Sequence, residues 1–449
     1  MQAYITRHLA EVAVRQEFIL KLARAMMMLG APSHRLRRQV IDAGHMLGLN
    51  VSAMHFPETM FISFEDTTTA TSSVRFLRQA STLDLGRLAE AYELYWRATH
   101  NELCVADASK QLSDLMQRKH IYPWWFIMLC GGISASAMCG ASFYGSFLDT
   151  VVVFPLGAAV IGIQHATAGH ELFTNVQEII IAAAFSFLSA CLASTGKICY
   201  SAVTSSSVAL VLPGMVALHG GLELMSRNLI SGSVRLIYAV IYAIFVAFGL
   251  FVGAELFELM TEKPVSGLED YYCSSVHTIE GPWWQRSSGV WWSFLTVPLV
   301  SLTLALCKYY PYKQWKELIL IVFISCSGYT VSHLVEVTKF SGQGDVSAGV
   351  GAFAVGLIAN LYGELFDGNA FVVMVVGISY LVPSAFGPNG LLAFVSLQSS
   401  GVAYAYVGAF SVGLRMVTVS IGLTVGLGLA LLITHPIPSG VKDGGVFSM

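Results

Sequence analysis

The chain has 449 residues, of which 55% are hydrophobic and only 12% are charged, with a formal net charge of −3 at pH 7. A soluble globular protein carries about 25% charged residues, so this composition excludes a chain that is soluble throughout. It favours an integral membrane protein, and the small net charge by itself indicates no class of partner.

Charge is concentrated in the first quarter of the chain. Residues 1–119 hold 14 of the 25 Lys and Arg residues and 12 of the 28 Asp and Glu residues. This shift in composition predicts a soluble N-terminal domain over 1–119. The domain's net charge of +2 (14 minus 12) comes with no basic stripe along one element, so no nucleic-acid partner is expected.

Apolar periodicity predicts a small α+β fold for this N-terminal domain. Gly30 is suited to end its first helix, and Asp84 is suited to cap a later one. In chain order we expect a helix at 12–29, a helix opened by Pro32 and Ser33, strands at 50–56, 59–65 and 74–77, and helices at 85–99 and about 106–117.

From residue 121 onward the chain carries ten apolar segments, each long enough to cross ~30 Å of hydrocarbon at ~20 residues per helix. They lie near 121–140, 148–166, 175–196, 199–215, 233–257, 289–307, 315–335, 346–366, 370–386 and 413–434. Seven of the eight Trp residues flank these segments, as is typical of membrane interfaces. The predicted fold is therefore an all-α multi-pass membrane domain of ten transmembrane helices, preceded by the α+β domain.

A polar loop divides the ten segments into two sets of five. Because five is odd, the second set would enter the membrane from the opposite side, so the two sets are predicted to be inverted repeats. The expected boundaries are 120–257 for the first repeat, 258–288 for the linker loop, 289–435 for the second repeat and 436–449 for a C-terminal tail.

The two repeats end in similar sequence. VLPGM (211–215) matches LVPSA (381–385), and Arg235 matches Arg415 at the start of the apolar segment that follows. Each copy is predicted to be a helix broken at its proline, Pro213 or Pro383. A duplicated membrane unit with a broken helix in each half is typical of a transporter.

Orientation is predicted from the Lys and Arg residues near the ends of the segments. Eight lie on the side of the N-terminal domain and five on the other side. This bias predicts that the N- and C-termini both face the cytosol, and it does not indicate which cellular membrane holds the protein.

The eight cysteines are scattered along the chain. None forms a CxxC pair or a Cys/His spacing typical of a metal site. We therefore interpret them as small buried apolar residues and expect no metal and no cofactor.

Several segments together resemble one family. They are FILKLARAMMMLGAPSHRL (18–36), VRFLRQ (74–79), ICYSAVTSSSVALVLPGM (198–215), GGLELMSRNLISGSVR (220–235), LIVFISCSGYTVSHL (320–334) and GAFAVGLIANLYGELF (351–366). The chain resembles the threonine/serine exporter (ThrE-like) family, and more closely its fungal branch, the pheromone-regulated membrane proteins. The resemblance implies a soluble helix-and-strand domain, ten transmembrane helices, and export of small polar amino acids or carboxylates.

Such a substrate needs polar partners inside the bilayer, because an unpartnered polar group there costs several kcal/mol. Candidate partners are hydroxyls and an amide in the apolar segments and backbone groups at the two predicted breaks. They are Thr204, Ser205, Ser206, Ser207, Pro213, Gly214, Asn360, Ser379, Tyr380, Pro383 and Ser384. The alternative is that these hydroxyls bond carbonyls of their own helix or hold helices together.

Ionisable residues in apolar segments are candidates for proton coupling, because charge is costly in lipid. The candidates are Glu364, His165, His170 and Glu171; His333 and Glu336 end another segment. All lie near segment ends, so contact with interfacial water is the alternative. Arg235 and Arg415 are expected to anchor helix ends by snorkelling.

Three classes of function stay open. The favoured one is a secondary transporter, with a small-molecule substrate and a lipid bilayer as its partners, working by alternating access with proton coupling as an option. The second is a receptor, fusion or scaffold factor that uses the acidic, aromatic loop at 258–288. The third, an intramembrane protease, rests on Gly342, Gly344 and Asp345 and lacks a second aspartate within the membrane. We therefore expect no enzyme activity.

A homo-oligomer is also compatible with the sequence. Gly422 and Gly426 leave space for close helix packing, which is a feature of helix interfaces in membranes.

Overall fold

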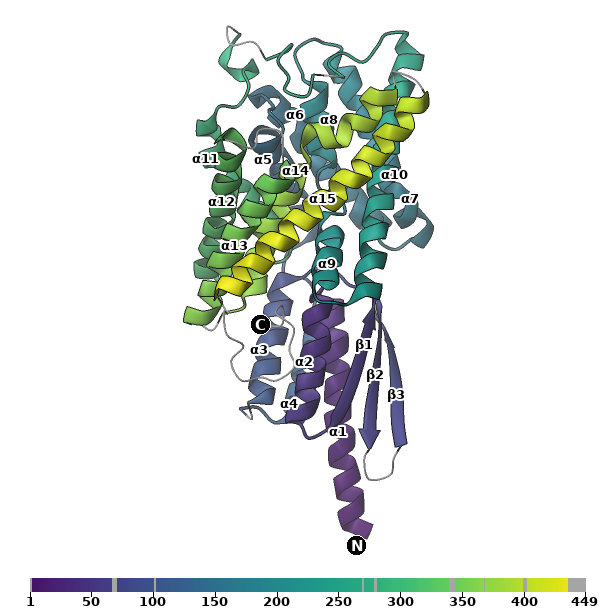
Figure 1. Ribbon diagram of the computed structural model, residues 1–449, viewed down its shortest axis with the longest axis vertical. Helices are drawn as coiled ribbons and strands as arrows, with labels where there is room; N and C mark the ends of the chain where they lie inside the picture. The colour runs from purple at the N-terminus through teal and green to yellow at the C-terminus, as the bar shows by residue number, and fades with distance from the viewer. Residues whose placement is uncertain are drawn as a thin grey trace.

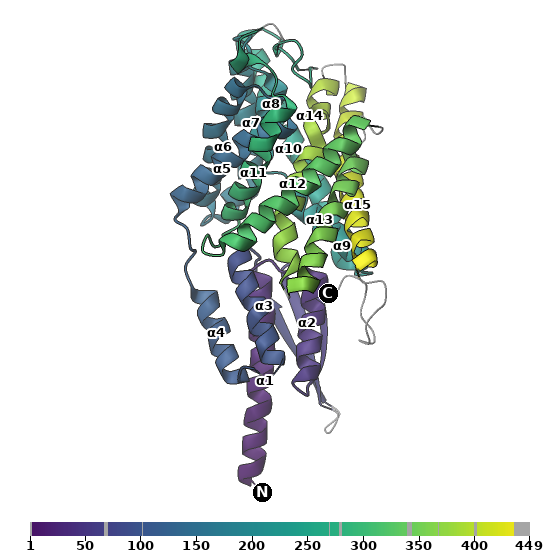
Figure 2. The ribbon, with the colours of Figure 1, turned by 90° about the vertical axis from the view of Figure 1, so that its left-hand side faces the viewer.

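The computed structural model describes residues 2–66, 71–100, 102–268, 270–277, 281–338, 344–366, 368–398 and 402–434. An N-terminal unit of helices and one sheet lies at one end of a taller bundle of apolar helices (Figure 1). Figure 2 shows the same division from a perpendicular direction, with α3 and α4 below α11 and α12.

The N-terminal unit has the predicted α+β composition. Its elements are α1 (Gln2–Met28), α2 (Ser33–Met46), β1 (Asn50–Phe56), β2 (Thr59–Asp66), β3 (Thr71–Arg78), α3 (Leu85–Thr99) and α4 (Val105–Gln117). The strands form an antiparallel sheet in the order β1-β2-β3. The predicted cap is confirmed, because the Asp84 carboxylate accepts a hydrogen bond from Arg87 N at 2.9 Å.

One face of β1 packs on α2. Val51 and Ala53 alternate with exposed residues along the strand, as a half-buried strand requires. Gly44 of α2 allows this contact, because a Cβ there would lie 2.5 Å from Val51 Cγ2.

The remaining helices form the bundle. They are α5 (Trp124–Ser142), α6 (Phe147–Thr167), α7 (Glu171–Ala193), α8 (Tyr200–Val208), α9 (Gly214–Met225), α10 (Leu229–Thr261), α11 (Val290–Cys307), α12 (Trp315–Thr338), α13 (Gly344–Phe366), α14 (Ala370–Gln398) and α15 (Val402–Thr434), with a short 3₁₀ turn, η1 (Trp283–Gln285). Within the described residues, eight helices are long and apolar enough to cross a membrane. The chain is therefore an integral, multi-pass membrane protein.

The fourth predicted segment, 199–215, is not one helix. It divides into α8, which has 9 residues, and α9, which has 12. Neither is long enough to cross a bilayer alone, and the apolar part of α11, Trp291–Cys307, is also short. These segments account for the difference between the ten predicted spans and the eight long helices.

The predicted break at Pro383 is wrong by four residues, because α14 stays helical through Pro383 and breaks at Gly387, where φ is 60° and ψ is 176°. The next residue is Pro388. A proline disfavours the helical conformation in the residue before it, and glycine accepts the positive φ that results. The Gly-Pro pair, rather than the earlier proline, ends the first part of α14.

The third and fifth helices of each half pack closely through glycine. A Cβ on Gly253 of α10 would lie 2.1 Å from Ala183 O of α7. In the other half, a Cβ on Gly426 of α15 would lie 2.0 Å from Gly349 O of α13, and one on Gly422 would lie 2.4 Å from Asp345 O. Gly422 and Gly426 therefore serve packing within the chain, contrary to the expected role in an oligomer.

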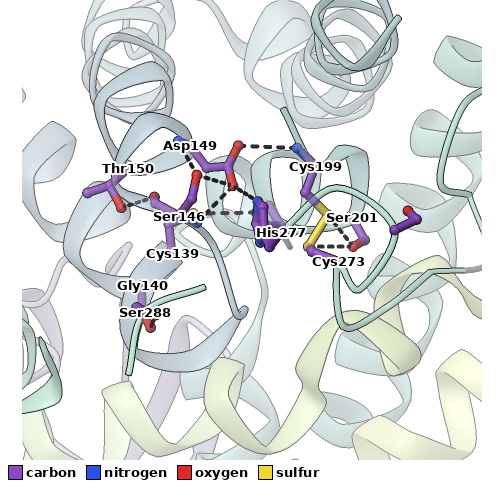
Figure 3. Close-up of polar contacts among 12 residues, drawn as sticks. Cys139, Gly140, Ser146, Asp149, Thr150, Cys199, Ser201, Cys273, His277 and Ser288 are labelled. Carbon is purple, nitrogen blue, oxygen red and sulfur yellow. Dashed lines mark hydrogen bonds and ion pairs between the residues drawn. A yellow bond between two sulfur atoms is a disulfide. The ribbon is translucent and has the colours of Figure 1, made fainter. Parts of the chain in front are cut away.

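A disulfide ties down the loop between α10 and α11, which lies at the end of the bundle opposite the N-terminal unit (Figure 1); Figure 3 shows the bond in yellow. It joins Cys199, at the start of α8, to Cys273 in the loop between α10 and α11. The expectation that all cysteines are unpaired is thus wrong, because the fold brings together two cysteines 74 residues apart.

A buried contact between a histidine and a carboxylate holds the same loop. His277 Nε2 lies 2.9 Å from Asp149 Oδ2, and both side chains are almost fully buried (Figure 3). Asp149 also forms a capping box with Ser146 at the start of α6 and accepts a hydrogen bond from Cys199 N at 3.2 Å. The disulfide and the His277–Asp149 contact together fix the loop to α6 and α8.

The N-terminal unit docks on the other end of the bundle. Leu85 N donates to Lys308 O at 2.9 Å, and the rings of His120 and Tyr309 stack with their centroids 4.3 Å apart. On the sheet side, His55 of β1 is 6% exposed, and Arg235 of α10 is the charged group acting on it. Burial first, and then the Arg235 charge, lower the pKa of His55 to about 4.

Candidate functional site

A polar cavity of about 80 Å³ lies at the break in α14, on the side of the bundle away from the N-terminal unit. Its walls come from α5, α12, α13, α14 and α15 and from the disulfide-linked loop. The lining residues are Ala141, Ser142, Tyr144, Tyr272, Tyr329, Ser332, His333, Glu336, Gly344, Ser384, Ala385, Phe386, Gly387 and Arg415. Tyr144 and Tyr272 are 39% and 56% exposed, so they form the rim.

Arg415 is the cation of this cavity. Its Nη2 donates to Ala385 O at 3.4 Å, and its Nε has no hydrogen-bond partner among the described residues. The break at Gly387 explains the first contact, because carbonyls just before a helix break lose their partners within the helix. Arg415 therefore lines a cavity and contacts the broken helix, whereas snorkelling into the interface was expected.

Aromatic residues wall the inner side of the cavity. The Tyr329 ring stacks on His333 and lies 5.6 Å from the Tyr380 ring. The buried Tyr380 hydroxyl lies 3.1 Å from Ser142 Oγ, which itself lines the cavity. Of the residues predicted from sequence, Ser384 lines the cavity and Tyr380 supports its wall.

Arg235, which matches Arg415 in sequence, lies at the opposite end of the bundle. It lies in the second turn of α10, next to the N-terminal unit, and its Nε lies 3.3 Å from Glu223 Oε1 of α9. The Glu223 side chain is completely buried, and that of Arg235 is 19% exposed. The helix pair is close enough to bury this ion pair because a Cβ on Gly220 would lie 2.9 Å from Leu236 N.

The two broken helices meet between these ends. A Cβ on Gly214, the first residue of α9, would lie 2.4 Å from Val382 of α14. Ser379 Oγ lies 3.1 Å from Met215 Sδ and also contacts Lys308 Nζ at the end of α11. The structure thus brings together Gly214 and Ser379, and Pro213 and Pro383 lie next to these contacts in sequence.

The four hydroxyls of α8 are fully buried and do not line the cavity. Ser206 donates to Ala202 O at 2.6 Å, and Ser207 donates to Thr204 O at 2.9 Å. These two serines therefore bond carbonyls of their own helix, which was the alternative to a role in substrate binding. Thr204 lies beside the Tyr200 hydroxyl. Ser205 Oγ has no hydrogen-bond partner among the described residues.

The residues predicted for proton coupling lie at helix ends. His165 and His170 are exposed at the junction of α6 and α7, and His165 stacks on Trp124. Glu171 is the first residue of α7, and Glu364 is exposed in the last turn of α13. Asn360 is partly buried one turn earlier in α13. Of the described side chains, those of His165, His170, Asn360 and Glu364 do not line the cavity.

Sequence reasoning missed Glu223 and Lys308. Both are charged residues within or at the end of apolar sequence, which is a signal of function in a membrane protein. They were overlooked because Glu223 lies in the short polar segment after the first break, and Lys308 was counted only as a charge flanking a span. Arg235 lies 12 residues after Glu223 and Ser379 lies 71 residues after Lys308, so neither pairing follows from a helical spacing.

Comparison with known proteins gives one matching family. A family model described as "Putative threonine/serine exporter" (ThrE) matches residues 17–257, which is more than half of the chain. No solved structure matches the chain.

Curated fungal relatives align with essentially all of the chain. Pheromone-regulated membrane protein 10 of Eremothecium gossypii is 32% identical over 461 residues, covering 100% of this chain and 60% of the relative. The protein of the same name from Candida albicans is 33% identical over 460 residues, covering 99% of this chain and 40% of the relative. An uncharacterized protein of Schizosaccharomyces pombe is 31% identical over 460 residues, covering 99% of this chain and 58% of the relative. The chain thus spans only 40 to 60% of the length of these relatives.

Proposed function

Because the chain belongs to the ThrE family of threonine/serine exporters, we propose that it is a secondary transporter for small polar amino acids or small carboxylates. The cavity at the break in α14 is the proposed substrate site. The observation that carries this proposal is Arg415, whose Nε lacks a protein partner at the wall of that cavity.

The cavity has the chemistry that a zwitterion requires. A guanidinium group binds a carboxylate through two parallel hydrogen bonds, so Arg415 would take the substrate carboxylate. Glu336 would take the ammonium group, and Ser384 would take a side-chain hydroxyl. A water needs about 10–15 Å³ of such volume, so 80 Å³ holds a molecule the size of serine or threonine.

Alternating access is the proposed mechanism, with two inverted five-helix repeats moving against each other. Ten crossings result when α8 and α9 count as one broken span and α11 as a short one. The inversion is supported by α10 and α15, which follow the matching sequences: α10 runs away from the N-terminal unit, and α15 runs towards it (Figure 1). The broken helices that meet at Gly214 and Val382 would form the moving seam.

The disulfide supports the proposed orientation. Disulfides persist in oxidising compartments, and Cys199–Cys273 lies at the end opposite the N-terminal unit. The N-terminal domain, residues 1–119, and the tail at 436–449 would then face the cytosol. With the outer side carrying the cavity rim and the N-terminal unit covering the inner side, the structure corresponds to an outward-facing arrangement.

Proton coupling through Glu364, His165, His170 or Glu171 stays a prediction. His333 and Glu336 line the cavity and are stronger candidates by position. A transport assay with and without a pH gradient tests both sets.

The alternative classes make different predictions. The printed name of the fungal relatives describes regulation by pheromone, and a receptor, fusion or scaffold factor would move no substrate. A protease would need a second aspartate near Asp345, but no other acidic residue is among the described residues lining the groove beside it, and Gly342 lies outside the described residues. We therefore propose no enzyme activity.

Flux through proteoliposomes tests the proposal. Purified protein should move labelled serine or threonine in a panel that also holds other amino acids and dicarboxylates. Arg415→Met should reduce flux about 10- to 100-fold, because a hydrogen bond to a charged group contributes about 1.5–3 kcal/mol. Arg227→Met, at an exposed position, is the control. Absence of flux for the whole panel in the unaltered protein would refute a carrier.

A further inference from the structure

Lys308 lies where three parts of the molecule meet. It directly follows the last residue of α11, so it lies just outside the apolar helix. Its carbonyl accepts a hydrogen bond from Leu85 N of the N-terminal unit. Its side chain turns the other way, into the bundle, and contacts α14.

The side-chain contact is with Ser379, one of the residues predicted to bind substrate. Ser379 Oγ donates to Val375 O at 2.6 Å within α14 and accepts a hydrogen bond from Lys308 Nζ. The same oxygen lies 3.1 Å from the sulfur of Met215, the second residue of α9. Lys308 therefore reaches the point where the two broken helices cross.

Lys308 has no carboxylate partner among the described residues, unlike two other partly or fully buried cations of the chain. In the described part of the chain, Arg87 pairs with Asp84 and Arg235 pairs with Glu223, whereas no carboxylate pairs with Lys308. An ammonium group has three donors, and only Ser379 accepts from it here. A buried charge without a counter-ion is costly, and burial accordingly lowers the pKa of Lys308 to about 7.

We propose that Lys308 is the anion-binding residue of the inner side, where it takes the carboxylate of a small substrate that enters from the N-terminal unit's side. The inference rests on the proposed transport function and adds a second anion site to that of Arg415. In the present conformation the Lys308 ammonium group donates to Ser379, and the path from the N-terminal unit's side to this group is closed. When α14 and α9 separate, the ammonium group is released and binds the substrate carboxylate.

This arrangement gives the substrate a path between two cations. Ser379 precedes the break at Gly387 by eight residues of α14, which at ~1.5 Å per residue corresponds to about 12 Å along the helix axis. A carboxylate that leaves Lys308 would pass the Tyr380 wall and reach Arg415. Because Lys308 is also held through its carbonyl by Leu85, movement of the N-terminal unit would affect this site first.

Binding can be tested without transport. The full-length protein is treated with an amine-acetylating reagent in the presence of glycerate, a small carboxylate without an amine, or of glycerol, its neutral analogue. We expect glycerate to slow acetylation of Lys308 at least about 5-fold and to leave the exposed Lys316 unchanged, and glycerol to protect neither. Equal acetylation of Lys308 in both solutions would overturn the proposal.

Flux from each side then tests the role in transport. In vesicles of one orientation, Lys308→Met should raise the KM for labelled serine about 10- to 100-fold from the N-terminal unit's side and less than about 2-fold from the other side. The KM of Lys308→Arg should stay within a few-fold of that of the unaltered protein. Lys316→Met is the matched control.

The two experiments fail separately. Protection of Lys308 by glycerate without any flux would retain the anion site and refute the carrier. Flux that Lys308→Met leaves unchanged from both sides would retain the carrier and refute the site. Lys308→Met should also melt no lower than the unaltered protein, because it removes a charge that has no anion partner.

Discussion

Two arginines that match in sequence lie at opposite ends of the bundle and have opposite surroundings. Arg235, beside the N-terminal unit, is neutralised by the buried Glu223. Arg415, its match in sequence, lines a cavity with its Nε unpartnered. A duplicated element thus has a structural role in one copy and an available anion-binding group in the other.

The presence of a carboxylate partner for Arg235 and not for Arg415 corresponds to a single position in the two similar segments. Glu223 lies ten residues after Pro213, and the residue ten positions after Pro383 is Ala393. The first copy therefore supplies its own carboxylate, and under the proposed function the second leaves that place to the substrate carboxylate. The predictions below test this comparison.

The largest effect is expected at the inner pair. Arg235→Met leaves Glu223 buried without a partner, and breaking a buried pair costs about 3–5 kcal/mol. Arg415→Met removes no carboxylate partner and should lower stability much less. Thermal unfolding of the detergent-solubilised variants measures both. A double variant, Arg235→Met with Glu223→Gln, should recover most of the loss; equal melting temperatures for Arg235→Met and Arg415→Met would contradict the comparison.

Acid should lower the stability of the folded protein through His55, which is buried where the N-terminal unit meets the bundle. Its pKa is about 4 in the folded protein, below its ordinary value of 6.5, so between these values the unfolded chain binds a proton that the folded chain does not. Stability therefore falls as pH falls from 6.5 to 4, by about 3 kcal/mol. Melting temperatures across this range should drop less in His55→Met than in the exposed control His100→Gln. An equal drop in both variants would exclude His55 as the cause.

Introducing a glutamate at the position that matches Glu223 should block anion binding at Arg415. Ala393→Glu places a carboxylate one turn beyond Gly390, where a Cβ would lie 3.4 Å from Arg415 Cγ. The new glutamate should compete with the substrate carboxylate and reduce flux about 10-fold, corresponding to about 1.4 kcal/mol. Ala393→Gln has nearly the same shape without the charge and should keep most of the flux. If both variants lose flux equally, steric hindrance explains the result.

The smallest effect is expected among the hydroxyls of α8. Ser205, like Thr204, has a buried hydroxyl without a hydrogen-bond partner among the described residues, so it could meet a substrate that leaves the cavity and passes α8 during transport, whereas Ser206 bonds its own helix. Ser205→Ala should change the KM for labelled serine about 3- to 5-fold, a fraction of one hydrogen bond. Ser206→Ala should change it less than about 2-fold. The opposite order would place the substrate on the other face of α8.

Local patterns predicted the elements of the N-terminal unit, although α1 begins ten residues before the predicted start at residue 12. The strands at 50–56 and 59–65 and the cap at Asp84 depend on alternation and on one side chain near its own backbone, and the structure confirms them. The second break was misplaced because one proline was weighed without its neighbour. The Gly387–Pro388 pair is a stronger signal, since both residues oppose helix at the same point.

The candidate site could be predicted only in part. Ser384 and Tyr380 follow from a polar segment beside a helix break, and the structure places both at the cavity or its wall. The coupling candidates at 165–171 do not reach it. Glu336 and Arg415 line the same cavity from α12 and α15, and no pattern within either helix indicates that they share it.

By itself, the sequence determined that this is a multi-pass membrane protein with a charged N-terminal unit, because composition and apolar length act locally along the chain. Only the tertiary structure decided which arginine is neutralised, which cysteines pair and where Lys308 points. Those outcomes depend on contacts between segments far apart in sequence, where burial makes the presence or absence of one partner energetically decisive.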